Sequence, residues 1–187
     1  YQINLLKRKE DVIRLIDEKG LMTDDLKNSI MSCSKLVEVE DLYRPYKEKK
    51  KTKATEAIKN GLEPLAKIIM SFPTKGSIDD IAQKYLNENV KDINSAIEGA
   101  SFIIAEWISD NAYYRKYIRN YTYKNGIITC NVKKDNPDTN KVYEMYYNYS
   151  ERIKDIKPHR VLAINRAENE KVITVNIDIN VDEIYNF

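Results

Sequence analysis

An apolar stripe in the middle of the chain constrains the fold more than any other feature. Its members recur at spacings of four, three, four and three residues, and they are Ile93, Ile97, Ala100, Ile104 and Trp107. This spacing places all five side chains on one face of an α-helix. Because an apolar face of that width is stable only when other elements cover it, the stripe predicts a helix with these five side chains buried inside a multi-helix fold.

Glycine is scarce, with 5 among 187 residues, whereas the usual share is about 7%. The scarcity disfavours a turn-rich β-sandwich, a glycine-rich nucleotide-binding fold and a disordered linker. We therefore predict a mainly α fold: an elongated multi-helix array with helix-turn-helix-like hairpins and a small β element near the C-terminus.

Local signals mark where the first helices begin and end. Gly20 follows an apolar-periodic segment and Thr23 is placed to cap the next helix, which predicts a tight helical hairpin. Pro45 must end the helix before it, because its ring removes a donor and clashes with the preceding turn. Gly61 and Pro64 predict a second pair of helices.

The second half of the chain contains both helical and strand patterns. Helices are expected near residues 78–85, 111–124 and 158–168. The β-branched runs at residues 127–132 and 172–179 predict two short strands that pair.

The domain organisation and compartment follow from what the chain lacks. No repeat or low-complexity linker divides it, so a single domain, 1–187, is expected. Because the chain opens on Tyr1 inside an apolar-periodic segment, we expect a fragment of a longer protein. Cys33 and Cys130 lie far apart, and no apolar run approaches the ~18 residues of a membrane span. A reducing, cytoplasmic location without membrane contact is expected.

Catalytic and metal-binding patterns are weak. His159 is the only histidine, and a structural role for it is favoured over proton transfer. The clustered carboxylates Glu38, Glu40 and Asp41 are interpreted as a solvated face, because alternate residues of a helix do not face one another. Walker A, GxGxxG and HExxH patterns do not occur. We expect no enzyme activity, no cofactor and no bound metal.

The densest charge block is a basic segment at the proline-broken helix end, residues 44–53, here called the basic elbow. It contains one carboxylate, Glu48, and six cations, Arg44, Lys47, Lys49, Lys50, Lys51 and Lys53. Its formal charge of +5 stands out in a chain whose net charge is only +2. Cations crowded at a helix break neutralise several phosphates at once, which favours nucleic-acid binding, whereas the alternative is a merely solvated charge run.

Tyrosines are concentrated in the second half, where nine of fourteen lie between Tyr113 and Tyr149. Tyrosine rings stack on unpaired bases. The helical spacing of Tyr113, Tyr117 and Tyr121 favours packing between helices first, with the hydroxyls at the rim.

Three motifs follow one another in the first half of the chain: Glu40-Asp41-Leu42-Tyr43-Arg44-Pro45-Tyr46-Lys47, Lys51-Thr52-Lys53-Ala54-Thr55 and Gly61-Leu62-Glu63-Pro64-Leu65-Ala66. In their order and spacing they resemble the N-terminal region of the bacterial Tex family of RNA-binding transcription accessory proteins. Later segments resemble the same family: Ala96-Ile97-Glu98-Gly99-Ala100 with Ala105-Glu106, Tyr149-Ser150-Glu151, and His159-Arg160-Val161-Leu162-Ala163 with Asn165-Arg166.

The resemblance covers nearly the whole chain and implies a helical scaffold of a nucleic-acid-binding protein. Family members continue into RNase H-like, helix-hairpin-helix and OB-fold RNA-binding domains, none of which is expected within these 187 residues. The resemblance adds His159, Arg160 and Arg166 to the basic elbow as candidate nucleic-acid contacts. It implies RNA or DNA, the other domains of the same protein and the transcription machinery as partners.

Two function hypotheses remain. In the first, a non-enzymatic helical scaffold holds the basic elbow rigid and adds weak, sequence-independent phosphate contacts. In the second, a purely structural or protein-interaction domain braces the rest of the protein or contacts the transcription machinery.

Overall fold

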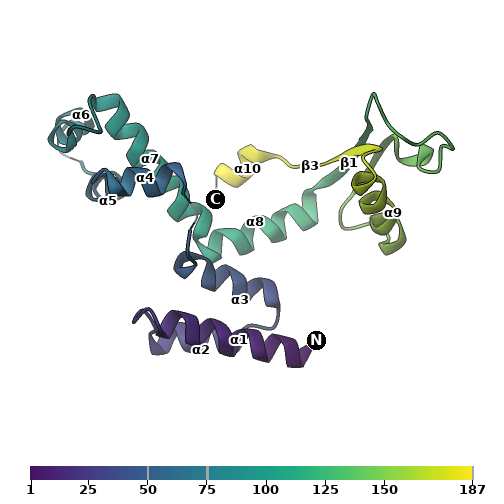
Figure 1. Cartoon of the computed structure of the whole chain (residues 1–187), viewed down its shortest axis with the longest axis horizontal. Coiled ribbons are helices and arrows are strands. Elements are labelled where there is room, and N and C mark those ends of the chain that lie inside the picture. The colour runs from purple at the N-terminus through teal and green to yellow at the C-terminus, as the bar shows by residue number, and fades with distance from the viewer. Residues whose placement is uncertain (50, 75, 187) are drawn as a thin grey trace. The chain divides into compact units, whose positions relative to one another are not determined.

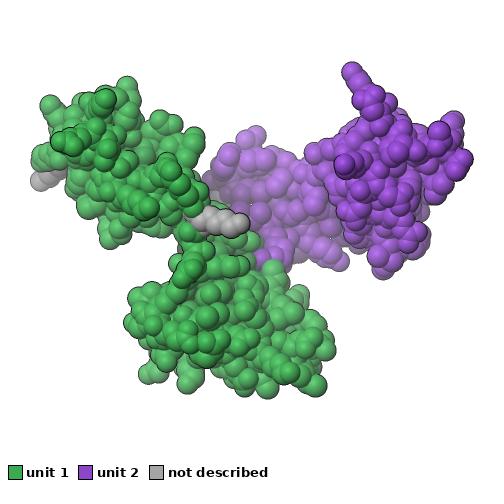
Figure 2. Space-filling view, in the orientation of Figure 1, with its two compact units in different colours: residues 1–115 green, residues 116–187 purple. Residues whose placement is uncertain are grey.

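The computed structural model describes residues 1–49, 51–74 and 76–186. They form two compact units, Tyr1–Arg115 and Lys116–Phe187, coloured green and purple in Figure 2. The fold is mainly helical with one small sheet near the C-terminus, which confirms the predicted fold class.

Three helices at the start of unit 1 pack around their own core (Figure 1): α1 (Gln2–Asp17), α2 (Asp24–Ser32) and α3 (Leu36–Tyr43). The buried side chains of this core are Leu5, Val12, Ile16, Ile30, Val39 and Tyr43. Gly20 has a φ of +67°, and the Thr23 hydroxyl accepts a hydrogen bond from the backbone N–H of Leu26. The predicted hairpin is confirmed, since glycine adopts this left-handed conformation without a Cβ clash.

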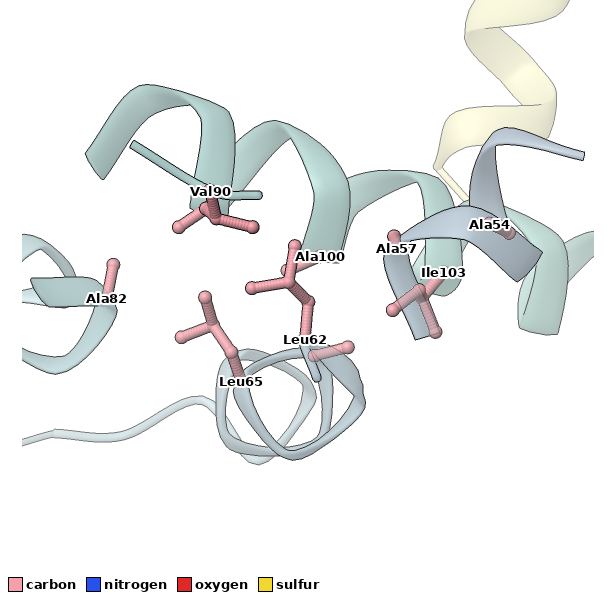
Figure 3. Close-up of a cluster of buried hydrophobic side chains, with 10 residues drawn as sticks. Ala54, Ala57, Leu62, Leu65, Ala82, Val90, Ala100 and Ile103 are labelled. Atoms are coloured by element: carbon pink, nitrogen blue, oxygen red, sulfur yellow. The ribbon is translucent and has the colours of Figure 1, made fainter. Parts of the chain in front are cut away.

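The remainder of unit 1 is a second helical layer. A 3₁₀ turn, η1 (Arg44–Tyr46), follows α3 at the predicted proline break. The helices after it are α4 (Lys53–Lys59), α5 (Glu63–Met70), α6 (Ile78–Ala82) with η2 (Gln83–Tyr85), and α7 (Ile93–Asp110). In their shared core, Leu62 and Leu65 extend toward Ala100 of α7 (Figure 3). This core fixes α7 beside α4 and α5.

The buried face of α7 differs by one residue position from the predicted one. Its most buried apolar residues are Ala96, Gly99, Ala100 and Ile103. Ile93, Ile97, Ile104 and Trp107 pack against the core but are only partly buried. The predicted helix is confirmed, whereas the prediction that all five stripe residues are buried is wrong for these four. The reason is size: the face with Ala96, Gly99 and Ala100 admits the closest approach of α4 and α5, and the larger side chains flank that contact.

Unit 2 is built on a three-stranded antiparallel sheet in the order β2-β1-β3. The long helix α8 (Ala112–Asn125) leads into β1 (Ile127–Val132), and η3 (Glu144–Tyr146) precedes β2 (Asn148–Arg152). The helix α9 (Pro158–Asn169), β3 (Ile173–Asp178) and α10 (Val181–Tyr185) complete the unit. The predicted pairing of the two β-branched runs is confirmed by the β1–β3 ladder, whereas β2 was not predicted.

The two faces of this sheet differ in polarity. Cys130 lies opposite Tyr149 and Val175, and this face packs with Ile164 and Ala167 of α9 into the core of unit 2. The other face carries polar side chains at paired positions: Thr129, Ser150 and Asn176, then Asn131, Asn148 and Thr174. Strand β2 escapes prediction because it lacks β-branched residues and its alternation is short.

Candidate nucleic-acid interface

The basic elbow connects α3 to α4, and each of its two ends is held by a local feature. Pro45 lies in the 3₁₀ turn that directly continues α3. At the other end, Thr52 caps α4: its hydroxyl accepts from the N–H of Thr55, and the Thr55 hydroxyl accepts from the N–H of Thr52. Both ends are therefore fixed by local backbone chemistry.

Two cations of the basic elbow bind carboxylates on the last turns of α7. The Arg44 Nε donates to Asp110 at 2.7 Å, and the Lys49 Nζ donates to Glu106 at 2.7 Å and to Asp110 at 2.5 Å. Glu106 also accepts from the Thr52 hydroxyl at 3.1 Å. Because residues 106 and 110 are one helical turn apart, a single lysine bridges them.

Burial makes this cluster a structural feature as well as an electrostatic one. The Asp110 side chain is 8% exposed, against 28% for Lys49 and 48% for Arg44. Burial lowers the pKa of Lys49, but the hydrogen bonds to Asp110 and Glu106 outweigh it, so that the net direction is upward. Lys49 therefore remains a cation, and the buried carboxylates have the partners that a buried charge requires.

A second ion pair lies beside this cluster. Asp41 of α3 accepts from the Arg115 Nε at 2.6 Å, and its side chain is only 6% exposed. Glu40 pairs with Arg8, and Glu38 accepts from the backbone N–H groups of Ser34 and Lys35. The interpretation of these three carboxylates as a solvated face is therefore wrong for Asp41, which is buried, whereas Glu38 and Glu40 stay partly exposed. The three side chains point in different directions, as their helix positions require. Each of them nevertheless has a hydrogen-bond or ion-pair partner within the protein.

The other residues of the basic elbow remain nearer to solvent. Lys51 pairs with Glu56 at 2.8 Å on the surface, and the Lys53 ammonium lies 4.6 Å from the centroid of the Phe102 ring. Lys47 forms no ion pair with any residue that the structure describes. The prediction for Lys50 lies outside the described residues.

A groove of about 400 Å³ runs between the basic elbow and α7. Cations and carboxylates both line it: Arg44, Lys47, Glu48, Lys49, Glu106 and Asp110. The predicted basic residues thus converge only in part. Arg44, Lys47 and Lys49 share the groove, while Lys51 and Lys53 contact Glu56 and Phe102 instead.

The three candidate residues of the last motif belong to unit 2. Arg160, on the first turn of α9, donates to Glu151 at 2.8 Å and to the Tyr149 hydroxyl at 3.2 Å. A hydrogen bond from the Tyr149 hydroxyl lowers the pKa of Glu151, and Arg160 lowers it further despite an opposing effect of burial. His159 and Arg166 are exposed on α9. Only Arg160 is held in place by a polar network.

Comparison with known proteins fits these motifs. A family model described as Tex central region-like matches residues 75–186.

The chain belongs to the Tex family.

Among its relatives, an uncharacterized protein of Bacillus subtilis, YdcI, is 50% identical over 188 residues, covering 98% of this chain and 26% of that protein. The Transcriptional accessory protein Tex of Neisseria gonorrhoeae is 31% identical over 183 residues, covering 98% of this chain and 24% of that protein. The S1 RNA-binding domain-containing protein 1 of Homo sapiens is 29% identical over 184 residues, covering 93% of this chain and 18% of that protein. The chain thus spans about a quarter of the length of the bacterial relatives.

The Tex motifs coincide with the ion-pair networks. The motif that begins at Glu40 supplies Asp41 and Arg44, and the later Ala105-Glu106 motif supplies Glu106. In unit 2, the motif residues Tyr149, Glu151 and Arg160 contact one another. The partners Asp110 and Arg115 were not predicted, because their ion-pair partners Arg44 and Asp41 lie 66 and 74 residues away in the sequence.

The described part of this Tex-family chain offers no cluster of three or more histidine, cysteine or carboxylate side chains able to hold a metal ion. Within the same residues, no helix combines the length and apolar character needed to cross a membrane.

Proposed function

We propose that this region is a helical scaffold module of a nucleic-acid-binding transcription accessory protein, without catalytic activity of its own. It positions the basic elbow for weak, sequence-independent contacts with phosphates. Two relatives bear names that refer to transcription and to an RNA-binding domain, which supports a nucleic-acid context. The other domains of the same protein and the transcription machinery are proposed as further partners.

The ion-pair cluster of Arg44 and Lys49 with Asp110 and Glu106 carries the scaffold part of this proposal. The cluster accounts for two of the cations at this helix break, because Arg44 and Lys49 hold the elbow against α7. Other cations of the elbow, such as Lys51, stay at the surface. Together with Glu56, the two α7 carboxylates reduce the formal charge around the elbow from +5 to +2. The contribution to binding is therefore modest, and among the described elbow residues we assign it to Lys47, Lys51 and Lys53, which are exposed and do not pair with Glu106 or Asp110.

A salt titration tests this division of roles. The 187-residue chain is titrated against a labelled 20-base-pair duplex by fluorescence anisotropy at several salt concentrations. If two to three phosphates are neutralised, log Kd changes with log salt with a slope of magnitude about 1.8–2.7, since each phosphate contributes about 0.9. The triple variant Lys47→Ala, Lys51→Ala, Lys53→Ala is expected to weaken binding equally for duplexes of different sequence and to flatten the slope.

The matched control replaces three exposed lysines elsewhere in unit 1, Lys27, Lys84 and Lys91, by alanine. It removes the same charge but leaves the elbow intact, so it is expected to bind nearly as the parent does. Equal binding by the elbow variant and the parent refutes a role of the elbow in binding. The alternative, a purely structural or protein-interaction module, then stands, and the pairing of Arg44 and Lys49 is the observation that favours it.

A further inference from the structure

The helix α8 is the most uniformly basic helix in the described structure. Its 14 residues include four cations and no carboxylate: Arg115, Lys116, Arg119 and Lys124 are the cations. The same helix carries five tyrosines, and none of its residues is buried. Because none of its residues is buried and all its charges have one sign, core packing does not explain the composition of this helix.

One face of the unit 2 part of α8 is open. Lys116, Asn120 and Tyr123 follow the i, i+4, i+7 spacing that places side chains on a single helical face, and Lys124 is adjacent to Tyr123 on that face. All four are exposed, with Tyr123 at 59%. Neither Lys116 nor Lys124 forms an ion pair with a described residue. This set of four residues is called the α8 surface.

The contacts of α8 with α10 involve other residues. The Tyr121 hydroxyl donates to Glu183 at 2.7 Å, and the Asn180 amide donates to the second oxygen of the same carboxylate. Tyr121 also stacks on Tyr117, with ring centroids 6.3 Å apart. The prediction that these tyrosines serve packing between helices is thus confirmed for Tyr121. Both oxygens of Glu183 accept hydrogen bonds from Tyr121 and Asn180, and Glu183 forms no ion pair with Lys116 or Lys124.

A third exposed cation adjoins the C-terminal end of α8. The backbone N–H of Ile153 donates to the carbonyl of Gly126 at 2.9 Å, which brings Lys154 next to the end of the helix. The nearby carboxylate, Asp155, is paired with Arg152 at 2.8 Å. An exposed cation outside the helix is thus the chain neighbour of a residue that is hydrogen-bonded just beyond the C-terminal end of α8.

We infer that the α8 surface binds single-stranded nucleic acid, with Tyr123 stacking on a base and Lys116, Lys124 and Lys154 contacting the phosphates on either side. Unpaired cations around an exposed aromatic ring match a flexible polyanion whose bases are free to stack. A duplex offers the same phosphates but no unstacked base, so the tyrosine gives the surface a preference for single strands. The inference shares with the proposed function only the class of partner, and it does not involve the basic elbow.

The test compares single strands with a duplex. The 187-residue chain is titrated by anisotropy against a 12-nucleotide oligouridylate, a 12-nucleotide oligothymidylate and a 12-base-pair duplex, where the first two separate RNA from DNA. Tyr123→Ala is expected to weaken binding to at least one single strand by about fivefold or more, the effect of losing one stacked base, and to leave duplex binding unchanged. Tyr123→Phe retains the ring and is expected to bind as the parent does.

The lysines are tested separately. Lys116→Ala with Lys124→Ala is expected to reduce the slope of log Kd against log salt by about 1.4, because each single-strand phosphate contributes about 0.7. The control Lys27→Ala with Lys84→Ala removes two exposed lysines of unit 1 and is expected to leave the slope unchanged. Far-ultraviolet circular dichroism verifies that each variant keeps its helix content.

Three results overturn the inference: no binding of either single strand by the parent, unchanged single-strand binding by Tyr123→Ala, or an equal loss in the two lysine pairs. Failure of the proposed function appears elsewhere, as unchanged duplex binding by the elbow variant. The two outcomes are therefore distinguishable within one set of titrations.

Discussion

Replacing Asp110 by alanine tests the clamp between the basic elbow and α7. The substitution removes the acceptor of the 2.7 Å bond from Arg44 and one of the two acceptors of Lys49. A hydrogen bond to a charged group contributes about 1.5–3 kcal/mol. Three effects reduce this loss of stability. Arg44 is 48% exposed, so water replaces the lost acceptor, and Lys49 keeps its hydrogen bond to Glu106. Removal of a negative charge from a helix C-terminus also stabilises the helix by a few tenths of a kcal/mol. We therefore expect a net loss of about 2 kcal/mol in the free energy of unfolding.

Urea denaturation followed by tryptophan emission measures this loss. Trp107 is the only tryptophan and lies on α7 close to Asp110, so its emission reports on unit 1. Asp110→Asn retains an acceptor without the charge and is expected to lose about half as much. The control Lys67→Ala breaks the exposed Glu63–Lys67 pair, which is worth less than about 0.5 kcal/mol.

The same substitution is expected to affect duplex binding in the opposite direction. It releases Arg44 for phosphate, so affinity rises and the salt slope steepens by about 0.9. If Asp110→Ala unfolds at the same urea concentration as Lys67→Ala, the contacts of Asp110 with Arg44 and Lys49 do not stabilise unit 1 more than an exposed ion pair does. Unchanged duplex binding by a variant that is destabilised as expected refutes only the role of Arg44 as a latent phosphate contact.

Two further predictions concern the packing of each unit. The hydrogen bond to Glu183 raises the pKa of Tyr121 to about 12. The stability that this hydrogen bond contributes is fully present below pH 10, the pKa of tyrosine in the unfolded chain, and is lost as the pH rises through about 12. Glu183→Gln is expected to return the pKa toward 10 in a tyrosine ring-carbon NMR titration, and an unmoved pKa contradicts this cause. In unit 1, a Cβ added at Gly99 would lie 2.4 Å from the Leu62 Cδ1, and Leu62 is buried. Gly99→Ala is therefore expected to destabilise by about 1 kcal/mol in the same urea assay, because overpacking exceeds the gain in helix propensity, whereas a stabilised variant would show that Leu62 moves aside.

Local structure could be predicted from short stretches of sequence. The hairpin at Gly20 and Thr23, the break at Pro45 and the turn at Gly61 depend on interactions within about four residues, and each is present in the structure. The helix at residues 93–107 was equally evident from its periodicity. The periodicity did not show which residues of this helix are the most buried. That depends on where the small residues Ala96, Gly99 and Ala100 meet other helices.

The role of the charged residues was decided by tertiary structure. The crowding of cations at the break after α3 follows from the order of residues alone. The sequence did not reveal that Arg44 would find Asp110, 66 residues away, or that Asp41 would be buried against Arg115, 74 residues away. Pairs so distant form only where helix packing brings their side chains together, and helix periodicity carries no information about which carboxylate will lie opposite. The exposure of Tyr123 and Lys116 also depends on tertiary packing. Helix periodicity places both residues on α8, but only the folded structure shows that no other element covers them.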